Sequence, residues 1–497
     1  MSKRFILALD QGTTSSRALL VNHSGEIVAS SHRDFKQIFP KVGWVEHDPE
    51  DIWRSQLESI KNVMQTSKIT SENIAAIGIT NQRETVVVWN RKTGQPIYNA
   101  IVWQDRRTAA VCDQLKSEGY GEEIKQKTGL VIDPYFSASK IKWILDHVDG
   151  SRISAKNGDL CFGTIDSWLI WKLTDGKRHL TDVTNASRTM IFDIHKLQWD
   201  ASLLALFDIP KAMLPEVKEC AEIYAETAIS QFSSPVKIAG VAGDQQAALV
   251  GQLCLSKGMA KNTYGTGCFL LMNTGKTPVV SNHELITTIA YQIQGQLHYA
   301  LEGSIFIGGA AVQWLRDGLE LINNASEIET LAASTTDNGG VYFVPALTGL
   351  GAPYWNPHAK GMVLGISRGT TQAHLARATL EGIAFQVYDV VKAMEEDSGQ
   401  FCKELRVDGG ASANDLLMQF QSDIFNCKVK RPKQLETTAL GAAYLAGLTV
   451  NFWSDLHTLE HVSKTGASIF KPNMDEKEIS YRIERWQKAV DLAQQWT

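Results

Sequence analysis

Residues 10–17 read Asp10-Gln11-Gly12-Thr13-Thr14-Ser15-Ser16-Arg17, and they follow an apolar run over 4–10 that predicts a β-strand. A carboxylate ends the strand, a glycine permits a tight turn, and hydroxyls and an arginine follow. Such a turn can present backbone N–H groups, hydroxyls and a positive charge to phosphate oxygens. Asp10 can hold Mg²⁺, because magnesium prefers carboxylate oxygens and substrate phosphates. A polar hairpin without a ligand is the less favoured alternative, since tight hairpins usually carry Asn-Gly or Asp-Gly.

The chain around this stretch alternates strands and turns. Further strands are predicted over 15–21 and 26–31. Asp48 as N-cap and Pro49 at the first helical position then predict a helix, and 75–80 has the pattern of a buried strand. Strands interrupted by a crossover helix indicate a mixed sheet covered by helices.

A similar order of elements restarts near residue 256. Gly265-Thr266-Gly267 leads into an apolar strand pattern over 268–272, a turn is predicted at 273–275, and a helix is predicted from about 305 to 321. A chain of 497 residues is too long for one ordinary core. We therefore expect two related α/β domains, and we place them at 1–250 and 251–497.

The composition excludes several classes of protein. The net charge of -5 argues against a nucleic-acid partner, which would need a strong basic patch. No apolar stretch approaches the ~18 residues of a membrane span, and the apolar run before Asp10 is too short for a secretory signal. The seven cysteines are scattered without a C-x-x-C pair, which favours reduced core thiols over a zinc site. We expect a cytoplasmic protein without stable membrane insertion.

Two further turns are candidates for a nucleotide site. The segment 408–414, Asp-Gly-Gly-Ala-Ser-Ala-Asn, lies between a predicted strand at 405–407 and a predicted helix at 415–425. Its glycines would let a nucleotide approach the backbone, and Asn414 could contact the base or ribose. A tight turn with a capped helix is about equally compatible with this segment, and Gly265-Thr266-Gly267 alone is a weak signal.

Polar residues that could bind a phosphoryl acceptor also follow predicted strands. Arg83 and Glu84 can donate to and accept from neighbouring hydroxyls of a polyol. Asp244 comes after an apolar strand over 236–241 and could take the proton of an attacking hydroxyl. The plainer interpretation of the Arg-Glu pair is a solvated turn.

Three motif matches are discounted. Gly275-Lys276-Thr277 resembles the end of a P-loop, and Gly265-Thr266-Gly267 resembles the start of a dinucleotide fingerprint, but each requires a glycine where Leu270 stands. Residues 365–369 match G-x-S-x-G, so an α/β-hydrolase is a rival. A hydrolase has no use for a magnesium carboxylate and phosphate turns.

The chain resembles the FGGY carbohydrate kinases, within the actin–hexokinase–Hsp70 fold group. One signature is Tyr135-Phe136-Ser137-Ala138-Ser139-Lys140-Ile141-Lys142-Trp143-Ile144-Leu145-Asp146-His147, and a second runs from Gly361-Met362-Val363-Leu364-Gly365-Ile366 to His374-Leu375-Ala376-Arg377-Ala378-Thr379-Leu380-Glu381. The second signature absorbs the G-x-S-x-G match. The resemblance covers essentially the whole chain. It implies two actin/hexokinase-like (ribonuclease-H-like) α/β domains with mixed sheets and an interdomain cleft.

Segments 81–85, 103–104, 133–136, 243–246 and 264–267 are similar to those of family members that phosphorylate glycerol. The resemblance implies an ATP- and Mg²⁺-dependent kinase that produces sn-glycerol 3-phosphate, with Asp244 as the base and Asp10 as the magnesium carboxylate. It implies that glycerol contacts Arg83, Glu84, Trp103, Tyr135, Asp244, Gln245 and Phe269. It implies that the nucleotide site contains Thr13, Thr14, Ser15, Arg17, Thr266, Gly309, Gln313, Gly410 and Asn414.

Two alternative functions and two departures from the family remain at this point. The alternatives are another FGGY kinase, such as one acting on a pentulose or gluconate, and a catalytically inactive sensor. Some bacterial members have a Gly-Gly-x-Arg loop that binds fructose 1,6-bisphosphate, and others a phosphorylatable histidine. Residues 229–235 carry neither feature, so we expect both controls to be absent. The expected assembly is a homo-oligomer, either a dimer or a tetramer.

Overall fold

The computed structural model describes residues 4–463 and 466–496 and forms two compact units. The first unit contains Met1–Leu253, Thr287–Tyr299 and Thr437–Ser463, and the second contains Cys254–Ile286, Ala300–Glu436 and Lys464–Thr497. Each unit combines helices with a mixed sheet, which confirms the predicted fold class of two α/β domains. Neither unit is contiguous in sequence.

The first unit is built on a six-stranded sheet with the order β13-β14-β5-β1-β2-β3. Strands β1, β5 and β14 are parallel, whereas β2, β3 and β13 run antiparallel to their neighbours. The almost fully buried run of β5 fits a central strand covered on both faces. The bounds are β1 Phe5–Gln11, β2 Ser15–Asn22, β3 Ile27–Asp34, β5 Ile74–Asn81, β13 Ala225–Glu226 and β14 Lys237–Gly243.

Helix α1 (Pro49–Ser67) begins where the sequence predicts. The Asp48 carboxylate accepts a hydrogen bond from the Glu50 N–H, and Pro49 occupies the first turn, where its missing N–H costs nothing. Ile52, Ile60 and the nearby Val63 face the core of the first unit.

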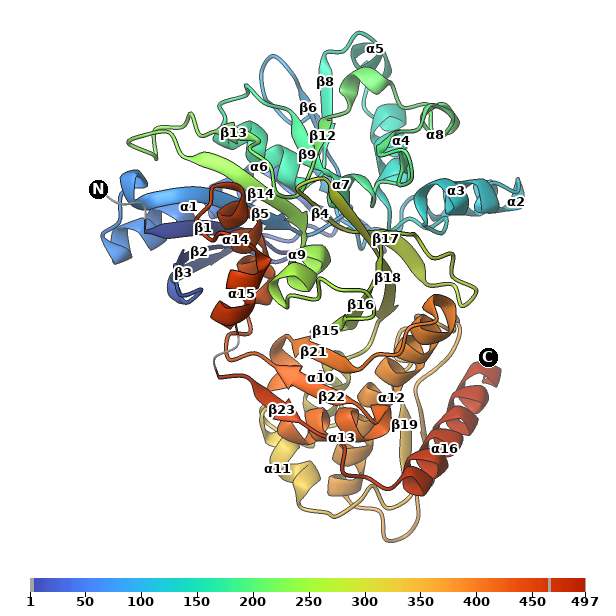
Figure 1. Ribbon diagram of the computed structural model, residues 1–497. Coiled ribbons are helices and arrows are strands. Elements are labelled where there is room, and N and C mark those ends of the chain that lie inside the picture. Colours follow the sequence, from blue (N-terminus) through green and yellow to red (C-terminus); the bar gives the residue numbers. More distant parts are fainter. Residues whose placement is uncertain (1–3, 464–465, 497) are drawn as a thin grey trace. The chain divides into compact units, whose positions relative to one another are not determined.

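Helices α9 (Asp244–Gly251) and α14 (Thr437–Thr449) pack closely against each other and against the sheet. Glycines make this approach possible: a Cβ on Gly251 would lie 1.9 Å from the Thr437 carbonyl oxygen, and one on Gly441 would lie 1.8 Å from that of Ala247. Figure 1 shows α14, in red, against the blue strand β1. A distant segment of the chain therefore completes the core that supports strands β1, β5 and β14.

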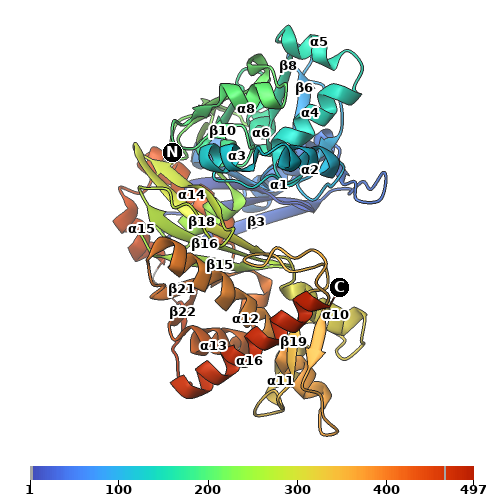
Figure 2. The same ribbon diagram turned by 90° about the vertical axis from the view of Figure 1, so that its right-hand side faces the viewer.

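A seven-stranded sheet has the order β17-β18-β16-β15-β21-β22-β23, of which β15, β16, β21, β22, β23 and the end of β18 belong to the second unit, where β19 and β20 form a separate pair. Strands β15, β21 and β22 are parallel, and β16 and β23 are antiparallel to their neighbours. Helix α16 lies beside α13 and β19, as Figure 2 shows. The bounds are β15 Ala260–Tyr264, β16 Cys268–Gly275, β17 Ile286–Ile293, β18 Gln296–Ile305, β21 Glu404–Asp408, β22 Lys428–Arg431, β23 Ser468–Phe470, β19 Tyr342–Val344, β20 Met362–Leu364, α10 Gly309–Asp317, α11 Glu327–Ala333, α12 Gln372–Ser398, α13 Asp415–Phe425 and α16 Glu476–Gln495.

Two predicted boundaries in this region are wrong. The helix expected over 305–321 is the shorter α10, because β18 continues to Ile305 and glycines flank the helix on both sides. The turn expected at 273–275 lies within β16, where the Asn273 side chain accepts a hydrogen bond from the Gly275 N–H.

The first unit carries further short elements around its sheet. They are β4 Glu46–His47, β6 Val87–Asn90, β7 Ala100–Ile101, α2 Ala109–Ser117, α3 Gly121–Thr128, α4 Ser137–His147, α5 Ser151–Lys156, β8 Leu160–Gly163, α6 Ile165–Leu173, β9 Leu180–Asp182, α7 Val183–Ala186, β10 Phe192–Asp193, β11 Gln198–Trp199, α8 Ala201–Leu206, β12 Glu216–Lys218 and α15 Leu456–Ser463. None of the helices in residues 4–463 and 466–496 is long and apolar enough to cross a membrane. All seven cysteines are buried thiols, as expected of small core residues.

Candidate active site

Three parallel strands of the first unit bring predicted site segments to one edge of the sheet. In the register of β1, β5 and β14, Gln11 lies opposite Asn81, and Asn81 lies opposite Gly243. The chain continues from these positions into the hydroxyl-rich turn after Gly12, into residues 82–84 and into Asp244. Ligand sites of α/β proteins characteristically form at the carboxyl ends of parallel strands.

Arg83 is the centre of this edge. Its Nε lies 3.2 Å from Asp244 Oδ1 and 3.6 Å from Glu84 Oε1. Its Nη1 donates to Gln246 Oε1 at 3.1 Å and its Nη2 to the Tyr135 hydroxyl at 3.4 Å. We call Arg83, Glu84, Tyr135 and Asp244 the strand-end cluster.

Glycine at position 243 makes room for the aliphatic part of the Arg83 side chain. A Cβ there would lie 2.8 Å from both Cγ and Cδ of Arg83. Asp244 then begins α9 and is about one-third exposed, whereas Arg83 is 2% exposed. The cluster therefore presents the Asp244 carboxylate at the surface, directly above the buried positive charge of Arg83.

Glu84 is buried rather than solvated. Its side chain is 1% exposed and accepts a hydrogen bond from Arg188 Nε at 2.6 Å. Its backbone has a φ of 61°, an uncommon conformation for a residue other than glycine, and its carbonyl accepts from the Ser137 hydroxyl. Since buried charges must be paired and strained backbone concentrates at functional sites, the solvated-turn alternative for Arg83 and Glu84 is wrong.

A chain of hydrogen bonds joins the end of β1 to Trp103. Gln82 Nε2 donates to Gln11 Oε1, Thr85 Oγ1 donates to Gln82 Oε1, and the Trp103 N–H donates to Thr85 Oγ1. The Trp103 indole N–H also donates to Thr13 Oγ1 at 3.1 Å. The Trp103 ring meets that of Tyr135 edge to face at 5.6 Å, so both aromatic rings border the cluster.

Lys140 holds the backbone of Tyr135 and Phe136 by hydrogen bonds. Its ammonium is fully buried and donates to the carbonyls of Tyr135 at 2.6 Å and Phe136 at 3.0 Å. Burial lowers the pKa of Lys140 to about 8. The sequence placed Lys140 in a signature but gave no sign of this role, because a lysine within a helical pattern normally faces water.

Asp10 fits a magnesium site of the kind that substrate phosphates complete. It is buried near the carboxyl end of β1, opposite Arg17 on β2 and Thr80 on β5. No group of three or more His, Cys, Asp or Glu side chains in the described part of the chain could hold a metal ion. Mg²⁺ commonly uses only one or two protein carboxylates together with phosphate oxygens and waters, so a single carboxylate is compatible with it.

The remaining residues of the predicted phosphate turn lie on the β1–β2 connection and at the start of β2. Thr14 is exposed, Ser15 and Arg17 are partly buried, and the Gly12 N–H bonds to the Ser15 carbonyl to close the turn. Gln245 is buried on α9, where its N–H donates to Asp244 Oδ1. Phe269, the seventh predicted acceptor residue, lies on β16 in the second unit, opposite Thr263.

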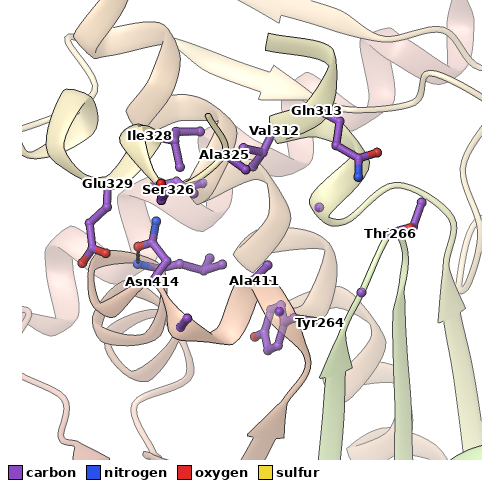
Figure 3. Close-up of a pocket in the computed structure, with 16 residues that line it drawn as sticks. Tyr264, Thr266, Val312, Gln313, Ala325, Ser326, Ile328, Glu329, Ala411 and Asn414 are labelled. Carbon is purple, nitrogen blue, oxygen red and sulfur yellow. Dashed lines mark hydrogen bonds between the residues drawn. The ribbon is translucent and has the colours of Figure 1, made fainter. Parts of the chain in front are cut away.

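The second unit contains a pocket of about 520 Å³, a volume typical of small-molecule sites. Five predicted nucleotide residues line it: Thr266, Gly309, Gln313, Gly410 and Asn414. In Figure 3, Thr266 and Gln313 lie on one side and Glu329 and Asn414 on the other. Its other lining residues are Tyr264, Gly265, Val312, Ala325, Ser326, Ile328, Glu329, Leu380, Ala411, Ala413 and Leu417.

The helix that starts beside this pocket is already capped. Asn414 Oδ1 accepts from the Leu417 N–H at 2.8 Å, and Glu329 Oε1 accepts from the N–H groups of Asp415 and Leu416. Because these groups are satisfied, the N-terminus of α13 has little left with which to bind phosphate. Asn414 therefore caps α13 and also lines the pocket, so its contact with a nucleotide stays a prediction. The pocket suits the nucleoside part of a nucleotide better than its phosphates.

The sequence did not indicate most of the pocket wall. Val312, Ile328, Leu380 and Leu417 follow helical spacing like any core residue, so no local signal separates them from packing positions. Glu329 is missed for the same reason, since a carboxylate in the first turn of a helix is ordinary.

The G-x-S-x-G match forms a surface turn. Ser367 is exposed, and its hydroxyl accepts from the Gly369 N–H. Residues 365–369 lead from β20 into α12 without the buried strand that supports a nucleophile elbow.

Comparison with known proteins identifies the family. Residues 5–251 match the N-terminal domain of the FGGY family of carbohydrate kinases, and residues 260–450 match its C-terminal domain. The chain belongs to the FGGY family. It is 60% identical over 493 residues to a glycerol kinase of Parabacteroides distasonis and 59% identical over 494 residues to one of Dichelobacter nodosus, with 99% of each chain covered in both cases. Its fold matches Plasmodium falciparum glycerol kinase with ADP at a TM-score of 0.94 and 38% identity, covering 99% of this FGGY chain and 98% of the other.

Proposed function

We propose that this FGGY kinase transfers the γ-phosphoryl group of ATP to glycerol and releases sn-glycerol 3-phosphate and ADP. The observation that carries the proposal is the strand-end cluster, where a buried arginine–glutamate pair stands beside the carboxylate of Asp244. The relatives at 60% and 59% identity are glycerol kinases that match this chain over 99% of their length, and that activity agrees with this chemistry. Family membership implies ATP as the phosphoryl donor.

The strand-end cluster would bind the acceptor. Arg83 donates hydrogen bonds to glycerol hydroxyls and Glu84 accepts them, while Tyr135 and Gln245 bind hydroxyls alongside. Trp103 and Phe269 pack on the carbon backbone. Glycerol is small, neutral and rich in hydroxyls, whereas a sugar acid would need an additional cation. A gluconate kinase is therefore less well supported, and the identity of 60% and 59% to glycerol kinases makes a pentulose kinase the weaker alternative.

Asp244 would act as the base. The attacking hydroxyl forms an O–P bond with the γ-phosphorus as the bond to the β-phosphate oxygen breaks, and the hydroxyl proton passes to the Asp244 carboxylate. In such reactions most of the rate enhancement comes from positioning and charge neutralisation. Mg²⁺ held by Asp10 would supply the neutralising charge on the phosphates.

The nucleotide would occupy the pocket of the second unit. The apolar wall of Val312, Ile328 and Leu417 suits the face of a purine, and Thr266 and Gln313 suit a polar group at the other end. Thr13, Thr14, Ser15 and Arg17 of the first unit would contact phosphate oxygens. We accordingly assign polyol binding and the phosphate turn to 1–250 and nucleotide binding to 251–497.

The proposed setting is a cytoplasmic homo-oligomer, a dimer or a tetramer, that acts on small molecules and binds no nucleic acid. Sedimentation of the purified protein measures the assembly. We also propose that fructose 1,6-bisphosphate leaves its activity unchanged, because residues 229–235 lack the binding loop; a clear effect in a titration would contradict this.

ADP release coupled to a spectroscopic signal tests the function. ATP and Mg²⁺ are supplied with glycerol, xylulose, ribulose or gluconate, and the native protein is compared with Asp244→Asn. We expect turnover with glycerol alone, and a loss of about 10²- to 10⁴-fold in the variant. Turnover with a different polyol would overturn the acceptor assignment, and no turnover from folded protein that binds ATP would favour a sensor.

A further inference from the structure

Asp182 is a buried carboxylate that connects to the strand-end cluster through its neighbours Thr184 and Asn185. Asp182 ends β9, is 0% exposed and caps α7. Its Oδ2 accepts from the N–H of Thr184 at 2.8 Å, from the Thr184 hydroxyl at 2.6 Å and from the thiol of Cys220. Its Oδ1 accepts from the N–H and the Nδ2 group of Asn185 at 3.0 and 2.8 Å. Both oxygens are therefore surrounded by donors.

The two residues that Asp182 holds are themselves bonded to the ends of β5 and β14. Thr184 Oγ1 accepts from the Gly243 N–H at 2.9 Å, directly before Asp244. The amides of Asn185 and Asn81 bond reciprocally at 3.0 and 3.1 Å, and Asn81 Nδ2 also donates to the carbonyl of Gln82, directly before Arg83. Since Asn81 and Gly243 are register partners, Asp182 connects to two neighbouring strand ends at once.

We propose that Asp182 is a positioning residue that sets the geometry of Arg83 relative to Asp244 through Thr184 and Asn185. This inference rests on the proposed function, because it concerns how the acceptor site is held in place. The Thr184 hydroxyl donates its proton to Asp182, which leaves its lone pairs directed to accept from the Gly243 N–H. Asn185 is fixed in orientation in the same way, since its Nδ2 donates to Asp182 and Asn81 while its Oδ1 accepts from Asn81.

Replacement by asparagine reveals this role with little change of volume. In Asp182→Asn one carboxylate oxygen becomes an NH₂ group, and either orientation turns that donor toward donors already in place. A buried donor that faces another donor makes no hydrogen bond, so the folded protein is destabilised by the desolvation free energy of that group. We therefore expect the side chains of Thr184 and Asn185 to reorient, and this change to shift the ends of β5 and β14 to which they are bonded.

Asp166 provides the matched control. It is also fully buried and close enough to Asp182 for their charges to interact. Its carboxylate accepts from the hydroxyls of Thr164 at 2.5 Å and Thr181 at 2.7 Å rather than from Thr184 and Asn185. A general requirement for buried charge in this region would affect both aspartates alike.

The test compares Asp182→Asn, Asp166→Asn, Thr184→Val and Thr184→Ser by thermal unfolding and by kcat and KM for glycerol and for ATP. We expect kcat/KM for glycerol to fall about 10- to 100-fold in Asp182→Asn and Thr184→Val, with KM for ATP little changed. Asp166→Asn and Thr184→Ser, which retains the hydroxyl, should keep kcat/KM for glycerol near the native value. Equal losses in the two aspartate variants, or native glycerol kinetics in Asp182→Asn and Thr184→Val, would overturn the proposal.

A structural readout separates this proposal from the proposed function and from a failure to fold. If the native protein turns over a different polyol, the same comparison is made with that polyol. If it turns over none, or if Asp182→Asn does not fold, crystal structures of native protein and Thr184→Val decide. We expect the Arg83 Nε to Asp244 Oδ1 distance of 3.2 Å in the native chain to lengthen in the variant; an unchanged distance would overturn the inference.

Discussion

The two candidate sites of this chain differ in what builds them. In the first unit, Arg83 and Glu84 are 2% and 1% exposed and bond to other side chains. In the second unit, Thr266 and Gln313 are exposed, and the pocket wall between the polar ends is apolar. Charge that is buried and paired has fixed geometry, because every displacement breaks a bond in a low dielectric. An apolar wall selects by shape and tolerates small movements.

This difference matches the tasks that we assign to the two sites. The acceptor hydroxyl must be aligned with the γ-phosphorus, and misplacement by about 1 Å costs roughly 10²-fold in rate. The nucleoside lies far from the transferred group and needs affinity more than alignment. Substitutions in the strand-end cluster should therefore lower kcat, whereas substitutions in the pocket should raise KM for ATP.

Arg83→Lys should have the largest effect. Lysine keeps the charge but lacks the planar guanidinium that contacts Asp244, Gln246 and Tyr135 at the same time. We expect kcat/KM for glycerol to fall by about 10³-fold with KM for ATP nearly unchanged, measured by steady-state kinetics. A loss confined to KM for ATP would show that the cluster does not serve the acceptor.

Asp166→Asn measures how much the buried Asp166 carboxylate lowers the free energy of unfolding. Burial, and then the charge of Asp182, raise the pKa of Asp166 to about 7. An unfolded aspartate ionises near pH 4, so the native state holds the extra proton between these values and stability falls as the pH rises. We expect the variant to gain stability relative to the native protein, by the order of a few kcal/mol between about pH 4 and about pH 8. Urea unfolding across this range checks it, and a difference independent of pH would contradict it.

Gly410→Val should affect the nucleotide alone. A Cβ at Gly410 meets nothing within 4 Å, so the variant should fold while its side chain fills the pocket. We expect KM for ATP to rise about 10- to 100-fold with KM for glycerol little changed. Gly121→Val is the control, because a Cβ there also meets nothing and Gly121 lies on α3 of the first unit. Equal changes of KM for ATP in the two variants would show that the pocket does not bind ATP.

Ser367→Ala should change nothing. The serine is an exposed turn residue, and its hydroxyl serves only the local turn in the contacts described above. Kinase activity and any esterase activity on a chromogenic ester are measured together. Loss of an esterase activity in the variant would revive the hydrolase alternative.

The sequence could predict the segments of the first site because polar residues directly after apolar strands stand out. Asp10, Arg83 and Asp244 were found in this way, and the register of β1, β5 and β14 places their segments side by side. Burial of Arg83 and Glu84 could not be predicted, since it depends on residues such as Gln246 and Arg188, which lie more than 100 residues away. The links from Asp182 through Thr184 and Asn185 to distant strand ends were hidden for the same reason.

The second site was predictable only where glycines mark it. Gly265 and Gly410 punctuate strand ends, but Val312, Ile328 and Leu417 resemble core residues, and only the fold shows that they surround a cavity. The overestimated length of α10 has the same origin. The helical spacing of apolar residues extends beyond the flanking glycines. In the structure, however, β18 continues to Ile305, so fewer residues remain for the helix.

The central claim is that this FGGY kinase joins phosphate to glycerol, and phosphorus NMR of the reaction products tests it most directly. Native protein is incubated with ATP, Mg²⁺ and glycerol, and Asp244→Asn is treated identically. We predict that a phosphomonoester resonance of glycerol 3-phosphate grows in step with ADP in the native reaction and is nearly absent in the variant. Formation of ADP with inorganic phosphate, or equal product from the variant, would contradict the account.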